Sequence, residues 1–200
     1  MVKRADKKNR ATSLSHPLSR AGGGVRLIFI TDAARVPDML KIVRALPAGS
    51  IVICRDYEHK DRAGLATSLR QLTREGRQLL LVAGDVRLAR TVGADGVHLP
   101  QHQLYTRPNL SGFSFVTAAC HDRKAMVQAA RLGVDLGLVS PVFETRSHEG
   151  AGALGIHRFA RLISHAPLAV AALGGVNSVS AKKLRPLDLA ALAAIDGLSA

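Results

Sequence analysis

Short apolar runs alternate with amphipathic segments along the chain from Val25 to Ile195. The runs are rich in Val, Ile, Leu and Ala, which is typical of strands buried on both faces of a parallel sheet. Eight strands are predicted, at 25–30, 50–54, 78–83, 97–99, 113–119, 136–140, 167–173 and 187–195. Strands that alternate with helices predict a compact (β/α)8 TIM barrel, with an open doubly wound sheet as the alternative.

The segments between these strands carry apolar residues at helical spacing, with Gly or Pro at several of their ends. The predicted helices are 36–46, 61–74, 85–92, 123–132, 156–164 and a last one from Asn177 or Ser178 to Arg185. The segment 102–112 contains Pro108 and only a weak helical pattern, so it is a poor candidate for a helix. Only five residues follow the last strand, so we expect the eighth helix to be short or missing.

The composition is that of one basic domain, poor in aromatic residues, behind a polar tail. We assign the barrel domain to residues 25–200, and the basic tail 1–24 is predicted to be disordered. The net charge is +13, but only 4% of the residues are aromatic. Single-stranded nucleic acids bind through aromatic stacking, so a small phosphorylated ligand fits better than a specific nucleic acid. A basic tail of this kind can bind nucleic acids without specificity, but more often it is a solvated extension.

Two cysteines, Cys54 and Cys120, lie far apart and do not have the spacing of a metal site. This usage predicts a reducing, cytoplasmic location without a disulfide framework. No apolar stretch is long enough to span a membrane, and residues 1–24 lack the apolar centre of a secretory signal. A missing eighth helix would expose apolar barrel surface, so a homodimer is a further expectation.

Polar residues and glycines follow the predicted strands, and in a barrel these carboxyl ends meet at one mouth. In the stretch 92–101, Gly93 ends a helix, a short strand follows, and His98 and Gln101 flank the strand end at Pro100. The other strands end in Thr31, Asp32, Arg55, Asp56, Gly84, His121, Ser140, Gly174, Gly175, Asp196 and Gly197. Arginine, histidine and glycine amides together predict an anion site with an acid–base group. The pair Gly174-Gly175 is predicted to hold a phosphate.

Five motifs, in this order and spacing, resemble those of the thiamine phosphate synthase/TenI family. They are LIFITD (27–32), GADGVHLP (93–100), CH (120–121), SPVFET (140–145) and LGGVN (173–177). The resemblance covers residues 27–195, nearly the whole predicted barrel, and the fold of the family is a (β/α)8 barrel. It implies a protein of thiamine biosynthesis that binds a phosphorylated thiazole or pyrimidine.

The family has a synthase branch, and this chain departs from its motifs. The second-strand motif of a synthase has Gln, Glu and Lys at the positions of Ile53, Asp56 and Tyr57. A synthase has a magnesium-binding Asp at the position of Gly84 and acidic residues at the positions of His102 and Gln103. It has a loop lysine at the position of His148. Only Arg55 of the second-strand motif is kept. Magnesium prefers carboxylate ligands, so we expect no metal and no other cofactor.

The TenI-like branch is closer, because it too has glycine at the position of Gly84 and LP after the fourth strand. It implies metal-independent isomerisation of a thiazole phosphate carboxylate to its aromatic tautomer, with His121 as the catalytic acid–base group. The expected phosphate-binding residues are Gly174, Gly175, Asp196 and Gly197, and the expected substrate contacts are Arg55 to the carboxylate, Thr31, His98, Gln101 and Ser140. The alternatives are a thiamine phosphate synthase, which joins a pyrimidine pyrophosphate to a thiazole phosphate, and a non-catalytic barrel that binds a phosphorylated ligand.

Several of these residues also have a plain structural interpretation. His98 lies within a strand, as hydrogen-bonded core histidines do, and His121 would equally cap the following helix. Asp56 would pair with Arg55 and so make the arginine structural. Cys120 is expected to be a buried, inert thiol rather than a nucleophile.

Overall fold

The computed structural model describes residues 26–145 and 152–197. The predicted tail 1–24, the first residue of the predicted first strand and His148 lie outside the described residues. The assignment of the tail therefore stays a prediction.

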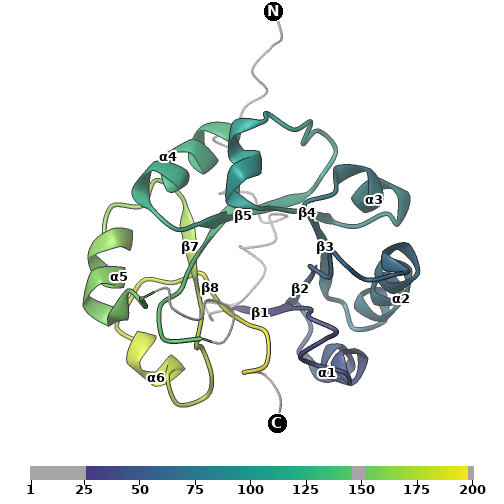
Figure 1. The fold of residues 1–200 in the computed structure, drawn as a ribbon, viewed down its shortest axis with the longest axis horizontal. Helices are drawn as coiled ribbons and strands as arrows, with labels where there is room; N and C mark the ends of the chain where they lie inside the picture. The colour runs from purple at the N-terminus through teal and green to yellow at the C-terminus, as the bar shows by residue number, and fades with distance from the viewer. Residues whose placement is uncertain (1–25, 146–151, 198–200) are drawn as a thin grey trace, which may run out of the picture.

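Eight parallel strands close into a barrel in chain order, as Figure 1 shows. They are β1 (Arg26–Ile30), β2 (Ile51–Cys54), β3 (Leu79–Ala83), β4 (Gly96–Leu99), β5 (Phe115–Cys120), β6 (Leu136–Val139), β7 (Ala169–Leu173) and β8 (Ala191–Ala194). The barrel closes between β8 and β1, where Arg26 lies opposite Ala191 and Phe29 opposite Ala194. The prediction of a (β/α)8 barrel is confirmed, and the open doubly wound sheet is excluded.

Helices surround the barrel and connect its strands (Figure 1). They are α1 (Met39–Ala45), α2 (Arg62–Glu75), α3 (Val86–Thr91), α4 (Arg123–Leu132), α5 (Gly155–Ile163) and α6 (Ala181–Leu184). Between β4 and β5 the chain forms a short 3-10 helix, η2 (Gln101–Tyr105), and no α-helix, as the weak helical pattern predicted. No helix follows β8 within the described residues, and the homodimer expected to cover that surface stays a prediction.

Helix α6 is shorter than the sequence predicts. The Asn177 side chain accepts hydrogen bonds from the amides of Val179 and Ser180, both at 2.9 Å. These bonds cap a turn rather than the helix itself, so α6 begins only at Ala181. Asn177 is thus a capping residue as predicted, but of the turn that precedes the helix.

Three aspartates fix the loops at the carboxyl ends of the strands by capping the next helix. Asp61, Asp85 and Asp122 each accept a hydrogen bond from the amide three residues later, at 2.8, 2.9 and 2.7 Å. The cap at Asp122 sets the position of the residue before it, His121, at the end of β5.

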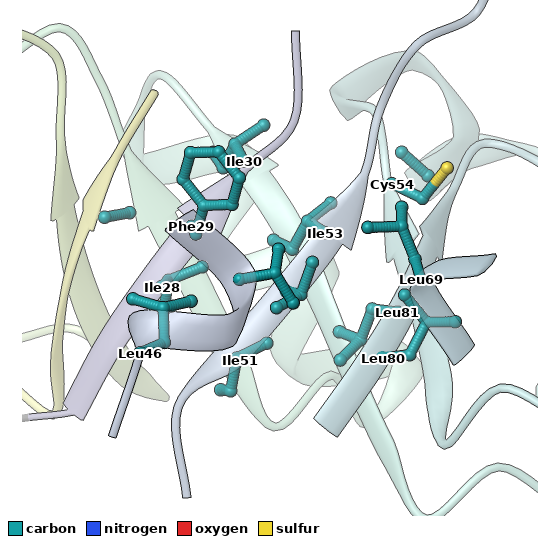
Figure 2. Close-up of a cluster of buried hydrophobic side chains, with 14 of the residues drawn as sticks. Ile28, Phe29, Ile30, Leu46, Ile51, Ile53, Cys54, Leu69, Leu80 and Leu81 are labelled. Atoms are coloured by element: carbon teal, nitrogen blue, oxygen red, sulfur yellow. The ribbon is translucent and has the colours of Figure 1, made fainter. Parts of the chain in front are cut away.

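The core is built from aliphatic side chains in two clusters. One joins β1, β2 and β3 to α1 and α2 and also includes buried residues of β5 to β8; Figure 2 shows part of it: Ile28, Phe29, Ile30, Leu46, Ile51, Ile53, Cys54, Leu69, Leu80 and Leu81. The other packs against α3, α4, α5 and α6 and includes Val97, Met126 and Phe159. Strands β4 and β5 approach closely at Gly96, where a Cβ atom would lie 1.7 Å from the carbonyl oxygen of Phe115.

Candidate active site

A small cavity, open to solvent, lies at the carboxyl ends of the strands. Its lining residues come from the ends of β1, β2, β6, β7 and β8 and the loops after them: Arg35, Arg55, Ser140, Thr145, Leu173, Gly174, Gly175, Val176, Ala194, Ile195 and Asp196. Five of the site residues predicted from the sequence therefore lie around one cavity: Arg55, Ser140, Gly174, Gly175 and Asp196. Arg35 and Thr145 were not predicted.

The two glycines after β7 form one wall of the cavity, at positions where a residue with a side chain would not fit. Gly174 and Gly175 have φ angles of +94° and +64°, which side chains rarely adopt. A Cβ atom on Gly174 would lie 2.8 Å from Cα of Pro141, and one on Gly175 would lie 2.5 Å from the carbonyl oxygen of Glu144. A Cβ atom on Gly197 would lie 2.0 Å from the carbonyl oxygen of Val176, so Gly197 packs against the backbone that follows the two glycines. The wall thus presents backbone to the cavity, as a phosphate cradle requires.

Arg55 forms its ion pair with Asp32 and not with Asp56. Its Nη2 lies 2.6 Å from Oδ2 of Asp32, across the β1–β2 pair. The carboxylate of Asp56 instead accepts hydrogen bonds from the hydroxyl of Thr31 and the amide of Ala33. The sequence-based alternative that paired Arg55 with Asp56 is therefore wrong, and an aspartate of the neighbouring strand end takes that place.

Thr31 is fully buried, and its hydroxyl group is already bonded within the protein. It accepts a hydrogen bond from the amide of Arg55 at 3.0 Å and donates to Asp56. These bonds connect the ends of β1 and β2 and hold the backbone from which the Arg55 side chain projects. The geometry supports a positioning role, and a direct contact of Thr31 with substrate stays a prediction.

His121 lies exposed at the rim, held at both its backbone and its ring. Its backbone amide donates to Oε1 of Gln101 at 2.7 Å, and Nε2 of Gln101 donates to Asp122 at 3.3 Å. Its Nδ1 lies 2.9 Å from the carbonyl oxygen of Ser140. A carbonyl only accepts hydrogen bonds, so Nδ1 carries the proton and the lone pair of the neutral ring lies on Nε2. Ser140 thereby links His121 to the cavity.

His98 points into a buried environment below this rim. Only 7% of the residue is exposed, and its Nδ1 lies 2.9 Å from the hydroxyl oxygen of Thr117. Burial, with smaller contributions from the charges of Arg55 and His121, lowers the pKa of His98 to about 4. His98 is therefore neutral at pH values near 7. This geometry favours the interpretation as a structural histidine, and its contact with substrate stays a prediction.

The two thiols are buried and protonated. Burial raises the pKa of Cys54 to about 11 and that of Cys120 to about 12. A protonated thiol is a poor nucleophile, so Cys120 beside His121 fits the expected inert role. Neither cysteine forms a disulfide.

The residues at the magnesium positions of the resembled synthases do not fit that ion. A Cβ atom on Gly84 would lie 3.0 Å from Cε1 of Tyr57 and 3.7 Å from Nε2 of Gln103, so these side chains occupy the space beside the glycine. Nε2 of Gln103 also donates a hydrogen bond to the carbonyl oxygen of Gly84 at 2.9 Å. Within residues 26–145 and 152–197, no group of three or more His, Cys, Asp or Glu side chains is placed to hold a metal. The donor set here lacks the carboxylates that magnesium prefers.

Arg35 is the functional candidate that the sequence analysis missed. Its Nη2 lies 2.6 Å from Oδ2 of Asp196, so the pair joins the loop after β1 to the end of β8. The signal was present in the sequence, because a basic residue shortly after a strand end lies at the mouth of a barrel. Only the closure of β8 onto β1, however, brings it beside Asp196.

Comparisons with known proteins place this chain in a family. Residues 27–198 match the family model described as thiamine monophosphate synthase. The thiamine-phosphate synthase of Alcanivorax borkumensis is 32% identical over 195 residues, covering 91% of this chain and 87% of the relative. That of Pyrococcus furiosus is 26% identical over 183 residues, covering 87% and 86%.

The solved structures agree with the sequence comparisons. The thiamine phosphate pyrophosphorylase from Pyrococcus furiosus superposes with a TM-score of 0.71 at 25% identity and covers 86% of each chain. None of the described helices is long and apolar enough to cross a membrane. The family resemblance found in the sequence motifs is confirmed: this chain belongs to the thiamine monophosphate synthase family.

Proposed function

We propose that this chain binds a phosphorylated thiazole in the mouth cavity and converts it in the formation of thiamine phosphate. The observation that carries the proposal is that Gly174, Gly175 and Arg55 all line one cavity. The phosphate would lie against the two glycines and Gly197, and the ring would extend towards Arg55 and Ser140. The two free cysteines fit a cytoplasmic location.

The reaction we propose first is the joining of the thiazole phosphate to a pyrimidine pyrophosphate, with release of pyrophosphate. The names of the relatives favour this synthase reaction over the isomerisation expected from the sequence motifs. Arg55 supports it, because its guanidinium at the end of β2 would stabilise the negative charge that develops on the departing pyrophosphate. The residues around Gly84 do not fit a magnesium ion, so the proposed charge stabilisation comes from Arg55.

A second candidate is the isomerisation of a thiazole phosphate carboxylate, and one observation favours it. The bond from Nδ1 of His121 to the carbonyl oxygen of Ser140 puts the lone pair of the neutral ring on Nε2, and Ser140 lines the cavity. His121 could therefore take a proton from the ring and return it at another position, which is the whole of a tautomerisation. Arg55 would then bind the substrate carboxylate rather than a pyrophosphate.

One set of assays separates these reactions. The purified protein is incubated with both phosphorylated halves, with and without a chelator, and separately with the thiazole tautomer. Formation of thiamine phosphate supports the synthase, and turnover of the tautomer alone supports the isomerase. Binding of thiazole phosphate in a calorimeter without either turnover would refute both and leave the non-catalytic barrel.

The variant His121→Asn tests the role of the histidine. For an isomerase we expect turnover to fall about 100-fold or more, because the acid–base group is lost. The exposed His157 of α5 offers a matched control, since it does not line the cavity. Equal turnover by His121→Asn and the unmodified protein would refute the isomerase mechanism.

A further inference from the structure

We propose that Arg35 binds the phosphate group of the ligand and that the carboxylate of Asp196 competes with this phosphate for Arg35. The identity of the ligand as a thiazole phosphate rests on the proposed function. The exchange itself depends only on the phosphate group, so it applies to any phosphomonoester that enters the cavity.

The Arg35–Asp196 pair lies at the site where the phosphate is proposed to bind. Arg35 and Asp196 both line the cavity that contains Gly174 and Gly175, and they come from opposite sides of the closure between β1 and β8. Nη2 of Arg35 lies 2.6 Å from Oδ2 of Asp196. A guanidinium group has five N–H donors in a planar fork, an arrangement that matches the oxygen atoms of a phosphate. Arg35 is therefore a cation already placed at the glycine wall.

The charges around the cavity determine which side chain can bind a phosphate. The other arginine of the lining, Arg55, is paired with Asp32 at the same Nη2–Oδ2 distance of 2.6 Å. A phosphate dianion next to Gly175 would lie near the negative charge of Asp196, and two acceptor groups do not bind each other without a proton between them. We therefore assign the phosphate contact to Arg35 rather than to the ionised side chain of Asp196, whose role in phosphate binding stays a prediction.

The solvent exposure of Arg35 and Asp196 allows their ion pair to open. The Asp196 side chain is 53% exposed and the Arg35 side chain 22%, so water reaches the carboxylate when it leaves the arginine. Exposed ion pairs contribute little to stability, whereas an arginine binds phosphate through two parallel hydrogen bonds. Exchange of the carboxylate for a phosphate at Arg35 is therefore favourable, and Asp196 lowers the net affinity of the site.

Three variants of the full chain test this exchange: Arg35→Gln, Asp196→Asn, and Lys41→Gln as the matched control. Lys41 has the same charge and lies on α1, where its partner is Asp38 on the surface. Calorimetry measures binding of inorganic phosphate, of thiazole phosphate and of the thiazole alcohol without phosphate. We expect Arg35→Gln to weaken both phosphate ligands about tenfold or more, Asp196→Asn to tighten them about fivefold, and Lys41→Gln to bind as the unmodified protein does.

The thiazole alcohol separates this role from a merely structural one. Its affinity should be the same in all variants, because it has no phosphate for Arg35 to bind. The conservative variant Arg35→Lys should keep most of the affinity for phosphate. Arg35→Met, which also removes the charge, serves in place of Arg35→Gln if thermal unfolding shows that the latter does not fold.

Two results would overturn the inference. Unchanged phosphate binding by Arg35→Gln would show that the phosphate lies elsewhere, and weaker binding by Asp196→Asn would show that the pair acts as a clamp. The proposed function fails separately: if thiazole phosphate binds as expected but neither turnover assay gives product, the exchange stands and the catalytic proposal does not.

Discussion

The buried ring of His98 makes the stability of this protein depend on pH in a calculable way. The pKa of His98 falls from an ordinary value of 6.5 in the unfolded chain to about 4 in the folded chain. Between these two values the unfolded chain binds a proton that the folded chain does not, so stability falls as the pH is lowered through this window. The contribution of His98 is fully present above pH 6.5.

The size of this effect follows from the two pKa values. Each pKa unit corresponds to about 1.4 kcal/mol, so the complete loss, reached below about pH 4, is about 3 kcal/mol. Between about pH 7 and about pH 5 the expected loss is about 2 kcal/mol. The variant His98→Asn keeps a polar atom near the hydroxyl of Thr117 but does not titrate, so this part of the pH dependence should disappear.

Urea unfolding at several pH values, followed by circular dichroism, measures the effect. His98→Asn will be less stable than the unmodified protein at neutral pH, because it leaves a cavity, but that cost does not change with pH. The quantity to compare is therefore the difference in unfolding free energy between two pH values, with His157→Asn as the surface control. Parallel curves for His98→Asn and the unmodified protein would refute the argument that burial depresses this pKa.

Three further substitutions test close contacts. Gly96→Ala should destabilise the barrel by about 3 kcal/mol or more, since its Cβ would lie 1.7 Å from the Phe115 oxygen; a normal urea midpoint would contradict this. Asp95→Asn should cost about 2 kcal/mol, because it breaks a 2.6 Å ion pair with Arg70, and the double variant with Arg70→Met should recover part of that cost. Gly175→Ala should weaken binding of thiazole phosphate in calorimetry, because the added methyl group would lie 2.5 Å from a backbone oxygen of the loop after β6.

The barrel was predictable from the sequence because each strand is a short apolar run with a clear end. The strands at 97–99 and 136–140 are found as Gly96–Leu99 and Leu136–Val139, within a residue or two at each end. The last helix was predicted too long, because Asn177 stabilises a turn by side-chain bonds that compete with helix formation. Local pattern thus determines which elements form, and side-chain capping determines where they begin.

The pairing of charges at the site was not predictable in the same way. Arg55 and Asp56 are neighbours in sequence, but the arginine reaches Asp32 because β1 and β2 align Ile30 with Ile53. The same holds for Arg35 and Asp196, which lie at opposite ends of the described chain and meet only on closure of the barrel. A sequence shows which charged residues reach the mouth, whereas strand register decides which of them touch.

The position of Tyr57 has a practical consequence for studying this protein. The chain has no tryptophan and two tyrosines, so its intrinsic ultraviolet emission comes from Tyr57 and Tyr105 alone. Tyr57 is 48% exposed, lies beside Gly84 at the mouth and stacks near the guanidinium of Arg62, 5.1 Å from its ring centre. Tyr57 does not line the cavity described above, so its emission reports changes at the ends of β2 and β3, including those at Arg62. The unlabelled protein therefore carries an optical reporter of this part of the mouth, and Tyr57→Phe identifies its share of the signal.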